Sequence, residues 1–314
     1  MFEPLVSIVI PLFNKETWIV QTLATVYNQT YKNWECLIIN DGSTDQSLSR
    51  VLEFTESHPA NWVIIDITNS GQAFARNRGI EIAKGELISF LDADDLWHPN
   101  KLKSQVELFS INSKVELVLS SYVIFKENQF RSFRMVKNRN ASKLVESWFD
   151  MRGFGGLIES TGMIKKSTLI ECGNFSDALS MASGLDLCLR VVRSRQTIVS
   201  PVPYVFYRLS DGQFHKNEDV LKRDMEITCL SHSTTVEIHE KLRIRHANYF
   251  YWSESRSLGE VRFLQRTLLA ILVFDIPKLI SLYFLITRNL LAFLRGFYYQ
   301  AKIQAFFQAH KSTL

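Results

Sequence analysis

The first third of the chain alternates between short apolar runs and helical stretches, and this alternation restricts the fold more than any other feature of the sequence. The apolar runs that predict strands are Leu5–Ile10, Glu35–Ile39, Trp62–Ile67 and Leu87–Leu91. The helical stretches between them are Glu16–Gln29, Thr44–Ser57 and Gly71–Ala83. Because strand–helix units of this length are joined by right-handed crossovers, they build a parallel sheet covered by helices. The sequence therefore predicts an α/β fold whose strands end at one common edge, where such sheets bind ligands.

The pattern changes after the fourth predicted strand. Shorter mixed elements run from Val115 to Arg208, with an amphipathic helix over Leu185–Arg193, and the rest of the chain is mostly helical in pattern. A chain of 314 residues is long enough for one or two domains. We expect one α/β domain made of two halves and a helical C-terminal extension, with the boundaries 1–112, 113–212 and 213–314.

Charge and cysteine content exclude several classes of protein. The formal net charge is +4 and the basic residues are scattered, so nucleic-acid binding is not predicted. The apolar start, Leu5–Leu12, lacks a basic segment before it and contains Pro11, so it predicts a strand rather than a signal peptide. The cysteines lie far apart without metal-ligand spacing, as is typical of buried thiols in a reducing compartment: Cys36, Cys172, Cys188 and Cys229. We expect a cytoplasmic protein.

Three carboxylates, Asp92, Asp94 and Asp95, follow directly after the last predicted strand of the first third. Packing them together costs free energy through mutual repulsion unless a cation or hydrogen-bond donors hold them. A hard divalent metal that also binds substrate phosphates is the usual solution. The alternative is a solvated acidic loop before a helix.

Other polar features are predicted at the same edge of the sheet. Pro11-Leu12-Phe13-Asn14 ends the first strand, and Asp41 ends the second. The helix that begins near Gly71 brings free backbone amides and Arg76 to this edge. Taken singly, Asp41 could be a turn-former and Arg76 a surface charge. Their convergence with the three carboxylates favours a ligand site.

These motifs, in this order, resemble those of the family 2 glycosyltransferases. The resemblance covers residues 4–208 and is carried by the segments Val6–Asn14, Ile38–Asp45, Asn69–Gly79 and Phe90–Asp95, with weaker matches at Gly173–Asp177, Asp186–Arg190 and Tyr207-Arg208. It implies the GT-A fold, a Rossmann-like and mostly parallel sheet flanked by helices, here with a helical C-terminal appendix. It also implies that 1–112 binds the nucleotide-sugar donor and 113–212 forms the acceptor side.

The resemblance also implies roles for single residues. Asp41 would accept a hydrogen bond from the ring imide of uracil or thymine, Arg76 would lie near the base and phosphates, and Asp92 would reach the ribose. Asp94 would hold a divalent metal, Mn²⁺ or Mg²⁺, that bridges the diphosphate. The full implied donor-binding set is Pro11, Phe13, Asn14, Asp41, Arg76, Asp92 and Asp95.

The expected catalytic base is missing from its usual place. The family carries an acidic pair just before the Asp-Leu-x-Leu-Arg helix, and here those positions are Ser183 and Gly184. Asp186 is the candidate base, although two residues along a helix turn a side chain by roughly 200°, so it would replace the base only in an extended chain. The structural alternative is that Asp186 caps the helix or pairs with Arg190. Further candidates from neighbouring loops are Glu159, Asp177, Asp211 and His215.

The resemblance implies a metal-dependent, inverting glycosyltransferase that moves a sugar from a UDP- or dTDP-sugar to a cell-surface glycan or lipid-linked acceptor. The Gln-x-x-Arg-Trp signature of processive synthases is absent from the sequence, which favours the addition of one sugar per encounter. The alternative function is a nucleotide-sugar-binding partner protein with little or no activity, which the loss of the acidic pair suggests.

The last segment of the chain combines aromatic and basic residues. In 279–314, phenylalanines and tyrosines interleave with Arg288, Arg295, Lys302 and Lys311. This pattern predicts an interfacial helix on an anionic membrane surface, which would make the protein peripheral on the cytoplasmic face of the membrane. The alternative is a helical hairpin packed on the catalytic domain.

Overall fold

The computed structural model describes residues 3–126, 129–134 and 158–209, together with 220, 223–224, 227–228 and 231–232. Residues 1–228 belong to one compact unit. Asp211, His215 and the segment 279–314 lie outside the described residues, as does nearly all of the predicted extension 213–314. Within the described part of the chain, no helix has the length and apolar character needed to cross a bilayer.

The first half of the domain is the predicted parallel sheet. Its strands run in the spatial order β3-β2-β1-β4 and are paired in parallel. Their bounds are Val6–Leu12 (β1), Trp34–Asp41 (β2), Trp62–Ile67 (β3) and Leu87–Phe90 (β4). The connecting helices are Ile19–Tyr27 (α1), Ser47–Ser57 (α2) and Gln72–Ile82 (α3). The alternation read from the sequence is thus confirmed, with helix bounds that differ by a few residues.

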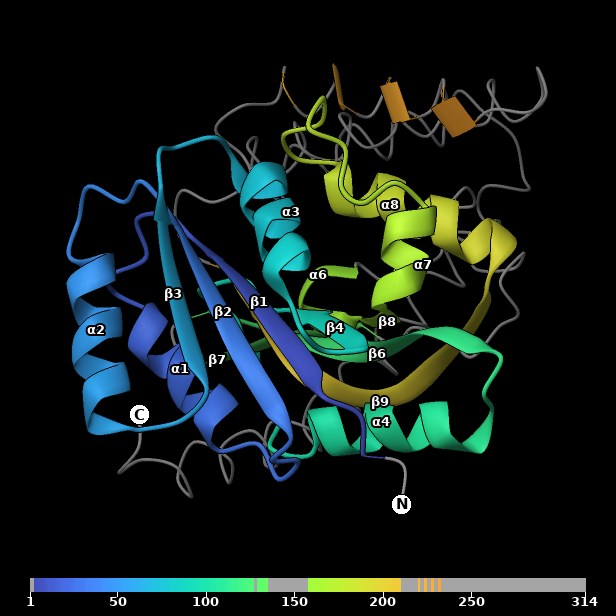
Figure 1. Cartoon of the computed structure of the whole chain (residues 1–314), viewed down its shortest axis with the longest axis horizontal. Helices are drawn as coiled ribbons and strands as arrows, with labels where there is room; N and C mark the ends of the chain where they lie inside the picture. The colour runs from blue at the N-terminus through green and yellow to red at the C-terminus, as the bar shows by residue number, and fades with distance from the viewer. Residues whose placement is uncertain are drawn as a thin grey trace, which may run out of the picture. The chain divides into compact units, whose positions relative to one another are not determined.

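The second half extends the same sheet with mostly antiparallel pairs, so the whole sheet is mixed (Figure 1). β8 lies between β4 and β6, and β9 pairs in parallel with β6. β5 pairs with β9, and β7 pairs with β6. The strands are Leu96–Trp97 (β5), Val115–Lys126 (β6), Gln129–Arg134 (β7), Met163–Lys165 (β8) and Gln196–Arg208 (β9). The helices are Lys101–Ile111 (α4), Ile158–Thr161 (α6), Lys166–Glu171 (α7) and Ser183–Ser194 (α8).

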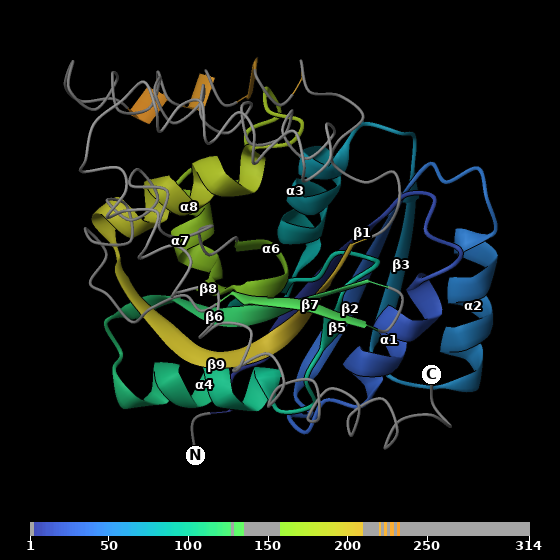
Figure 2. The ribbon, with the colours of Figure 1, turned by 180° about the vertical axis from the view of Figure 1, so that it is seen from behind.

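Two hydrophobic cores lie on opposite faces of the sheet. Side chains of a strand alternate between the faces, so Ile8 and Ile10 of β1 pack with α1, α2 and α4, whereas Val9 between them packs with α3, α7 and α8. Figures 1 and 2 show these two sets of helices on either side of the sheet. The resulting three-layer arrangement holds the carboxyl ends of β1, β2 and β4 at one edge.

Candidate functional site

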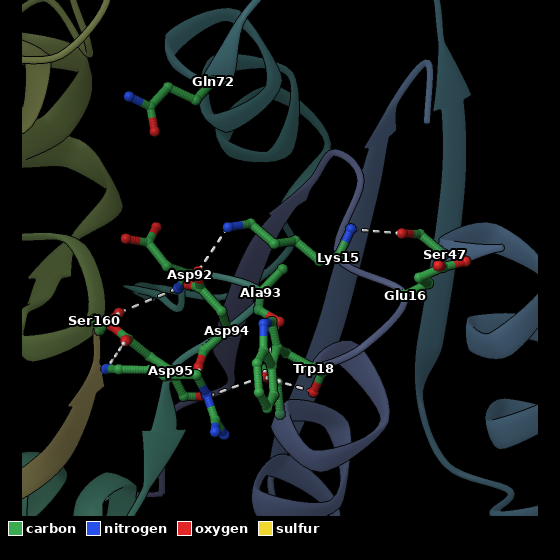
Figure 3. Close-up of polar contacts among 12 residues, drawn as sticks. Lys15, Glu16, Trp18, Ser47, Gln72, Asp92, Ala93, Asp94, Asp95 and Ser160 are labelled. Atoms are coloured by element: carbon green, nitrogen blue, oxygen red, sulfur yellow. Dashed lines mark hydrogen bonds and ion pairs between the residues drawn. The ribbon is translucent and has the colours of Figure 1, made fainter. Parts of the chain in front are cut away.

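The three carboxylates after β4 each have a different partner, and Figure 3 shows those of Asp94 and Asp95. Asp92 Oδ1 accepts from Arg76 Nη2 at 2.7 Å, and Asp94 Oδ2 accepts from Lys15 Nζ at 2.6 Å. Asp95 accepts from the Ser160 hydroxyl at 2.5 Å on one oxygen and, on the other, from the backbone N–H of Arg208 at 3.0 Å. Repulsion among the carboxylates is therefore offset by two cations and two hydrogen-bond donors.

Burial distinguishes the roles of these acids. Asp94 and Asp95 are buried, whereas 29% of the Asp92 side chain is exposed. Burial raises the pKa of Asp95 well above its usual range, and Asp94 and Asp92 raise it further. Burial also raises the pKa of Asp94, with Lys15 opposing this shift. Asp95 is thus enclosed in the protein and supports the cluster, while Asp92 is the most accessible of the three to a ligand.

Arg208, at the end of β9, contacts the acidic loop through hydrogen bonds to Asp94 and Asp95. No role was predicted for it from the sequence. Its Nε donates to the Asp94 carbonyl at 2.8 Å, and its Nη2 donates to Gln21 Oε1 at 2.8 Å. The guanidinium carbon lies 4.1 Å from the ring centroid of Trp18 and 4.6 Å from that of Phe125. Burial lowers the pKa of Arg208 to about 10, against the opposing effect of Asp95 and Asp94, so the side chain is a cation at neutral pH.

Lys15 is a second site residue that the sequence analysis missed. It follows Asn14 directly, and its backbone N–H donates to Ser47 Oγ at 2.7 Å, which ties the end of β1 to the start of α2. Its position next to the Pro11–Asn14 motif was the signal that could have pointed to it. The ammonium on Asp94 reduces the negative charge of the loop.

The residues predicted to bind the base lie at the ends of β1 and β2. Asn14 Oδ1 accepts from the Thr44 N–H at 2.9 Å, and the Asn14 N–H donates to Ser43 Oγ at 3.1 Å, so the two strand ends are linked. Phe13 is exposed and Pro11 is half-buried in β1. The contacts of these side chains with a base stay predictions.

Asp41 fixes the start of α3. Its two carboxylate oxygens accept from the N–H groups of Ser70, at 2.6 Å, and Gly71, at 2.9 Å. A carboxylate oxygen has a second lone pair, so these bonds leave acceptor capacity for the imide of a base. The predicted role of Asp41 in base binding is compatible with this geometry, and its role in holding the backbone just before α3 is an addition to it.

Arg76, on α3, has guanidinium N–H donors that make no hydrogen bond within the protein. Its side chain is buried with its guanidinium 5.3 Å from the ring centroid of Phe175, and Nη2 is occupied by Asp92. Nε and Nη1 have no hydrogen-bond partner. Buried guanidinium donors are normally satisfied, so these two suit an anionic group such as a phosphate.

Asp186, the predicted base, lies in the first turn of α8 and forms the structural pair that was its alternative. Nε and Nη2 of Arg190 donate to its Oδ2 at 3.0 and 2.7 Å. Because the chain is helical from Ser183, the extended conformation that would let Asp186 replace the missing base is not present. Asp177 accepts from the side chain of Asn77 at 3.2 Å. The catalytic assignment of Asp186 stays a prediction that this geometry disfavours.

The donor set around Asp94 fits a divalent ion only in part. In the described ranges, no group of three or more His, Cys, Asp or Glu side chains is placed to hold a metal. Asp92 and Asp94 do offer carboxylate oxygens, which Mg²⁺ and Mn²⁺ prefer, and such ions often take their remaining ligands from substrate phosphates and water. These residues therefore fit a metal that binds together with a diphosphate.

Comparison with known proteins identifies the family. The model of glycosyl transferase family 2 matches residues 7–169. The glucosyltransferase WfgD of Escherichia coli, named as acting on UDP-Glc and α-D-GlcNAc-diphosphoundecaprenol, is 37% identical over 131 residues, which are 41% of this chain and 49% of WfgD. The chain therefore spans only about half the length of that relative.

The amylovoran biosynthesis glycosyltransferase AmsB of Erwinia amylovora is 30% identical over 225 residues, which are 68% of this chain and 73% of AmsB. The solved mannosyltransferase PcManGT of Pyrobaculum calidifontis, in complex with GDP-Man and Mn²⁺, matches with a TM-score of 0.58 and 17% identity, over 99% of this chain and 87% of that one. This likeness confirms the GT-A fold. The chain belongs to glycosyl transferase family 2.

Proposed function

We propose that this protein is a glycosyltransferase. It moves one sugar per encounter from a UDP- or dTDP-sugar to a lipid-linked or polysaccharide acceptor, with inversion at the anomeric carbon and with a divalent metal at Asp94. The observation that carries the proposal is the cluster at the carboxyl edge of the sheet, where Lys15 and Arg76 neutralise Asp94 and Asp92. The named substrates of WfgD and the polysaccharide pathway of AmsB support the donor and acceptor classes.

The chemistry follows from the charges of this cluster. Transfer breaks the bond between the anomeric carbon and the diphosphate, and negative charge builds on the leaving group. The unpartnered Nε and Nη1 of Arg76 are available to stabilise that charge. A metal ion bound by Asp94 would neutralise more of it. Pro11, Phe13, Asn14 and Asp41 would hold the base, so that donor and acceptor are aligned when they react.

Asp94→Asn is expected to lower metal-dependent release of nucleoside diphosphate by about a hundredfold, because the carboxylate charge that holds the ion is lost while the shape of the side chain is kept. The assay uses purified protein, Mn²⁺, a panel of UDP- and dTDP-sugars, and an acceptor-rich membrane extract. Binding of Mn²⁺ with UDP, measured by calorimetry, should weaken in parallel. Glu56→Gln is the matched control, since Glu56 is an exposed acid on α2.

Two results would contradict this proposal. Turnover that is equal with EDTA and with Mn²⁺ would show that the reaction does not depend on a divalent metal. UDP binding without turnover of any donor would favour the alternative function, a nucleotide-sugar-binding partner, for which the observation is Ser183 and Gly184 in place of two acids.

The proposed cellular location is the cytoplasmic face of a membrane, with contact through 279–314, whose aromatic and basic residues suit an anionic surface. Co-sedimentation with anionic liposomes should be strong for the full chain and weak for a chain that lacks 279–314. Equal sedimentation of the two would refute the contact, and neutral liposomes provide the control.

A further inference from the structure

Gly184 and Glu159 compete for the same volume. A Cβ atom at position 184 would lie 1.7 Å from Glu159 Oε1 and 2.2 Å from Glu159 Cδ, which is far inside any van der Waals contact. Gly184 belongs to α8 and has no positive φ, so its backbone conformation does not require glycine. A side chain at position 184 would instead have to displace the Glu159 carboxylate from its present position. Position 184 is one of the two at which the family is expected to carry the acidic pair.

We propose that Glu159 is the catalytic base of this transferase and that it places a carboxylate where a side chain at position 184 would otherwise lie. The inference rests on the proposed function, since a base is needed only if an acceptor hydroxyl is activated. The catalytic acid then comes from α6 instead of α8, and the absence of a side chain at Gly184 leaves space for its carboxylate.

The segment that carries Glu159 is fixed to the acidic loop. Ser160, the next residue, donates its hydroxyl to Asp95 Oδ2 at 2.5 Å and accepts from the Asp92 N–H at 3.1 Å. The Ser160 carbonyl accepts from Trp97 Nε1 at 2.9 Å. These bonds hold the backbone of Glu159 in a set position relative to Asp92 and Asp94, as a reacting group next to the donor must be held.

Several buried polar atoms at and near Glu159 make no hydrogen bond. Glu159 Oε2 is buried without a hydrogen bond, and so are Nη1 and Nε of Arg76. Arg76 Nη1 lies 4.0 Å from Glu159 Oε1, which makes an ion pair without a hydrogen bond. Unsatisfied groups of this kind are rare in folded proteins, and a catalytic role is one explanation for them. An acceptor hydroxyl that donates to Glu159 would satisfy the carboxylate, and donor phosphate oxygens would satisfy the guanidinium.

The surroundings also suit a base. Burial raises the pKa of Glu159, with Arg76 opposing the shift and Asp92 adding to it. On the facing helix α8, burial raises the pKa of Cys188 to about 12, so this neighbour stays a neutral thiol. A carboxylate with a raised pKa accepts a proton more readily than an ordinary one, and the nearby Arg76 favours its charged form. Asp186, by contrast, is already held by two hydrogen bonds from Arg190.

The step can be written with all atoms accounted for. The acceptor oxygen forms a bond to the anomeric carbon, and its proton passes to a carboxylate oxygen of Glu159. The bond from the anomeric carbon to the diphosphate oxygen breaks, and its electron pair leaves with the nucleoside diphosphate. The protonated Glu159 returns its proton to water when the products leave.

The test is a set of variants of the full chain, assayed with UDP-glucose, Mn²⁺ and a synthetic α-GlcNAc-diphosphate lipid. If this pair is not turned over, the same assay is run with the sugar panel and membrane extract. Glu159→Gln should lower turnover by about 10²- to 10⁴-fold and leave UDP binding unchanged. Gly184→Asp alone should be less stable to heat, because its Cβ meets Glu159. The double variant Glu159→Ala with Gly184→Asp should be more stable to heat than Gly184→Asp alone. Its turnover should be at least ten times that of Glu159→Ala.

Sodium formate should raise the turnover of Glu159→Ala but not that of the wild type, since a purely structural loss is not restored by a small carboxylate. Glu171→Gln is the matched control, because Glu171 is exposed and pairs with Arg195 away from the acidic loop. Full turnover in Glu159→Gln, or loss of turnover in Asp186→Asn with Glu159→Gln unaffected, would overturn the inference. If the wild-type protein turns over no donor, the result would instead contradict the proposed transferase function itself.

Discussion

Replacing Arg208 by methionine is expected to lower the free energy of unfolding by about 3–5 kcal/mol, because removing one partner of a buried charged network leaves the others uncompensated. Arg208 is 2% exposed, and it is the link between the Asp94 carbonyl, Gln21 and the rings of Trp18 and Phe125. Methionine keeps much of the apolar contact with the rings but makes neither hydrogen bond. Asp94 and Asp95 would remain buried with one cation fewer.

Urea unfolding followed by circular dichroism measures this loss. Arg208→Lys should be intermediate, since an ammonium keeps the charge but cannot donate in the two directions that Nε and Nη2 serve. Arg78→Met is the matched control, because the Arg78 side chain is 39% exposed and pairs only with the more exposed Glu81, and little change is expected there. Equal stability of Arg208→Met and Arg78→Met would show that the buried cation is not needed by the acidic loop.

The parts of the fold that could be predicted from sequence are those determined by local patterns. The runs that form β1, β2, β3 and β4 are apolar and separated by helical stretches, so each strand and helix can be predicted from its own residues. Because such strand–helix–strand units have right-handed crossovers, the strands are also predicted to pair in parallel. Once the sheet is parallel, the strand ends must share an edge, which is why Asp41 and Asp92 were placed correctly at the same edge of the sheet.

The parts that could not be predicted depend on contacts between distant segments. β8 is only Met163–Lys165 and β5 only Leu96–Trp97, which is too short for any periodic signal, and yet β8 joins the two halves of the sheet. Arg208 reaches Asp94 through the pairing of β9 with β5, which no local pattern encodes.

Gly184 shows how an apparent loss in the sequence can be misleading. In the sequence it is only a missing acid, and Glu159 is one of several acids in neighbouring loops. In the structure the Glu159 carboxylate occupies the space into which a side chain at position 184 would point. The sequence does not reveal this contact, because α6 and α8 are far apart along the chain. Of the five candidate bases, Asp211 and His215 lie outside the described residues. Among the other three, position in space rather than residue type favours Glu159 over Asp177 and Asp186.

Gly79→Ala is expected to lower both stability and turnover, because α3 packs so closely on β1 that there is no room for a methyl group. A Cβ atom at position 79 would lie 2.3 Å from Val9 Cγ1. Alanine normally favours a helix interior over glycine by about 1 kcal/mol, but overpacking of this kind costs about 1–3 kcal/mol. The helix must move away from the sheet, and it carries Arg76, which contacts Asp92 and lies near Glu159. A shift of about 1 Å at such a site can lower turnover by about a hundredfold.

The cause of the loss can be separated from a general effect of the substitution by changing Val9. Val9→Ala with Gly79→Ala removes both methyl groups that meet the new Cβ, and the nearest remaining atom, Val9 Cβ, would lie 3.2 Å away. Turnover of the double variant should therefore exceed that of Gly79→Ala, even though Val9→Ala alone costs stability by leaving a cavity. Simple additivity of the two losses would show that α3 does not transmit the clash to Arg76, and the coupling between core packing and the donor site would then have to be abandoned.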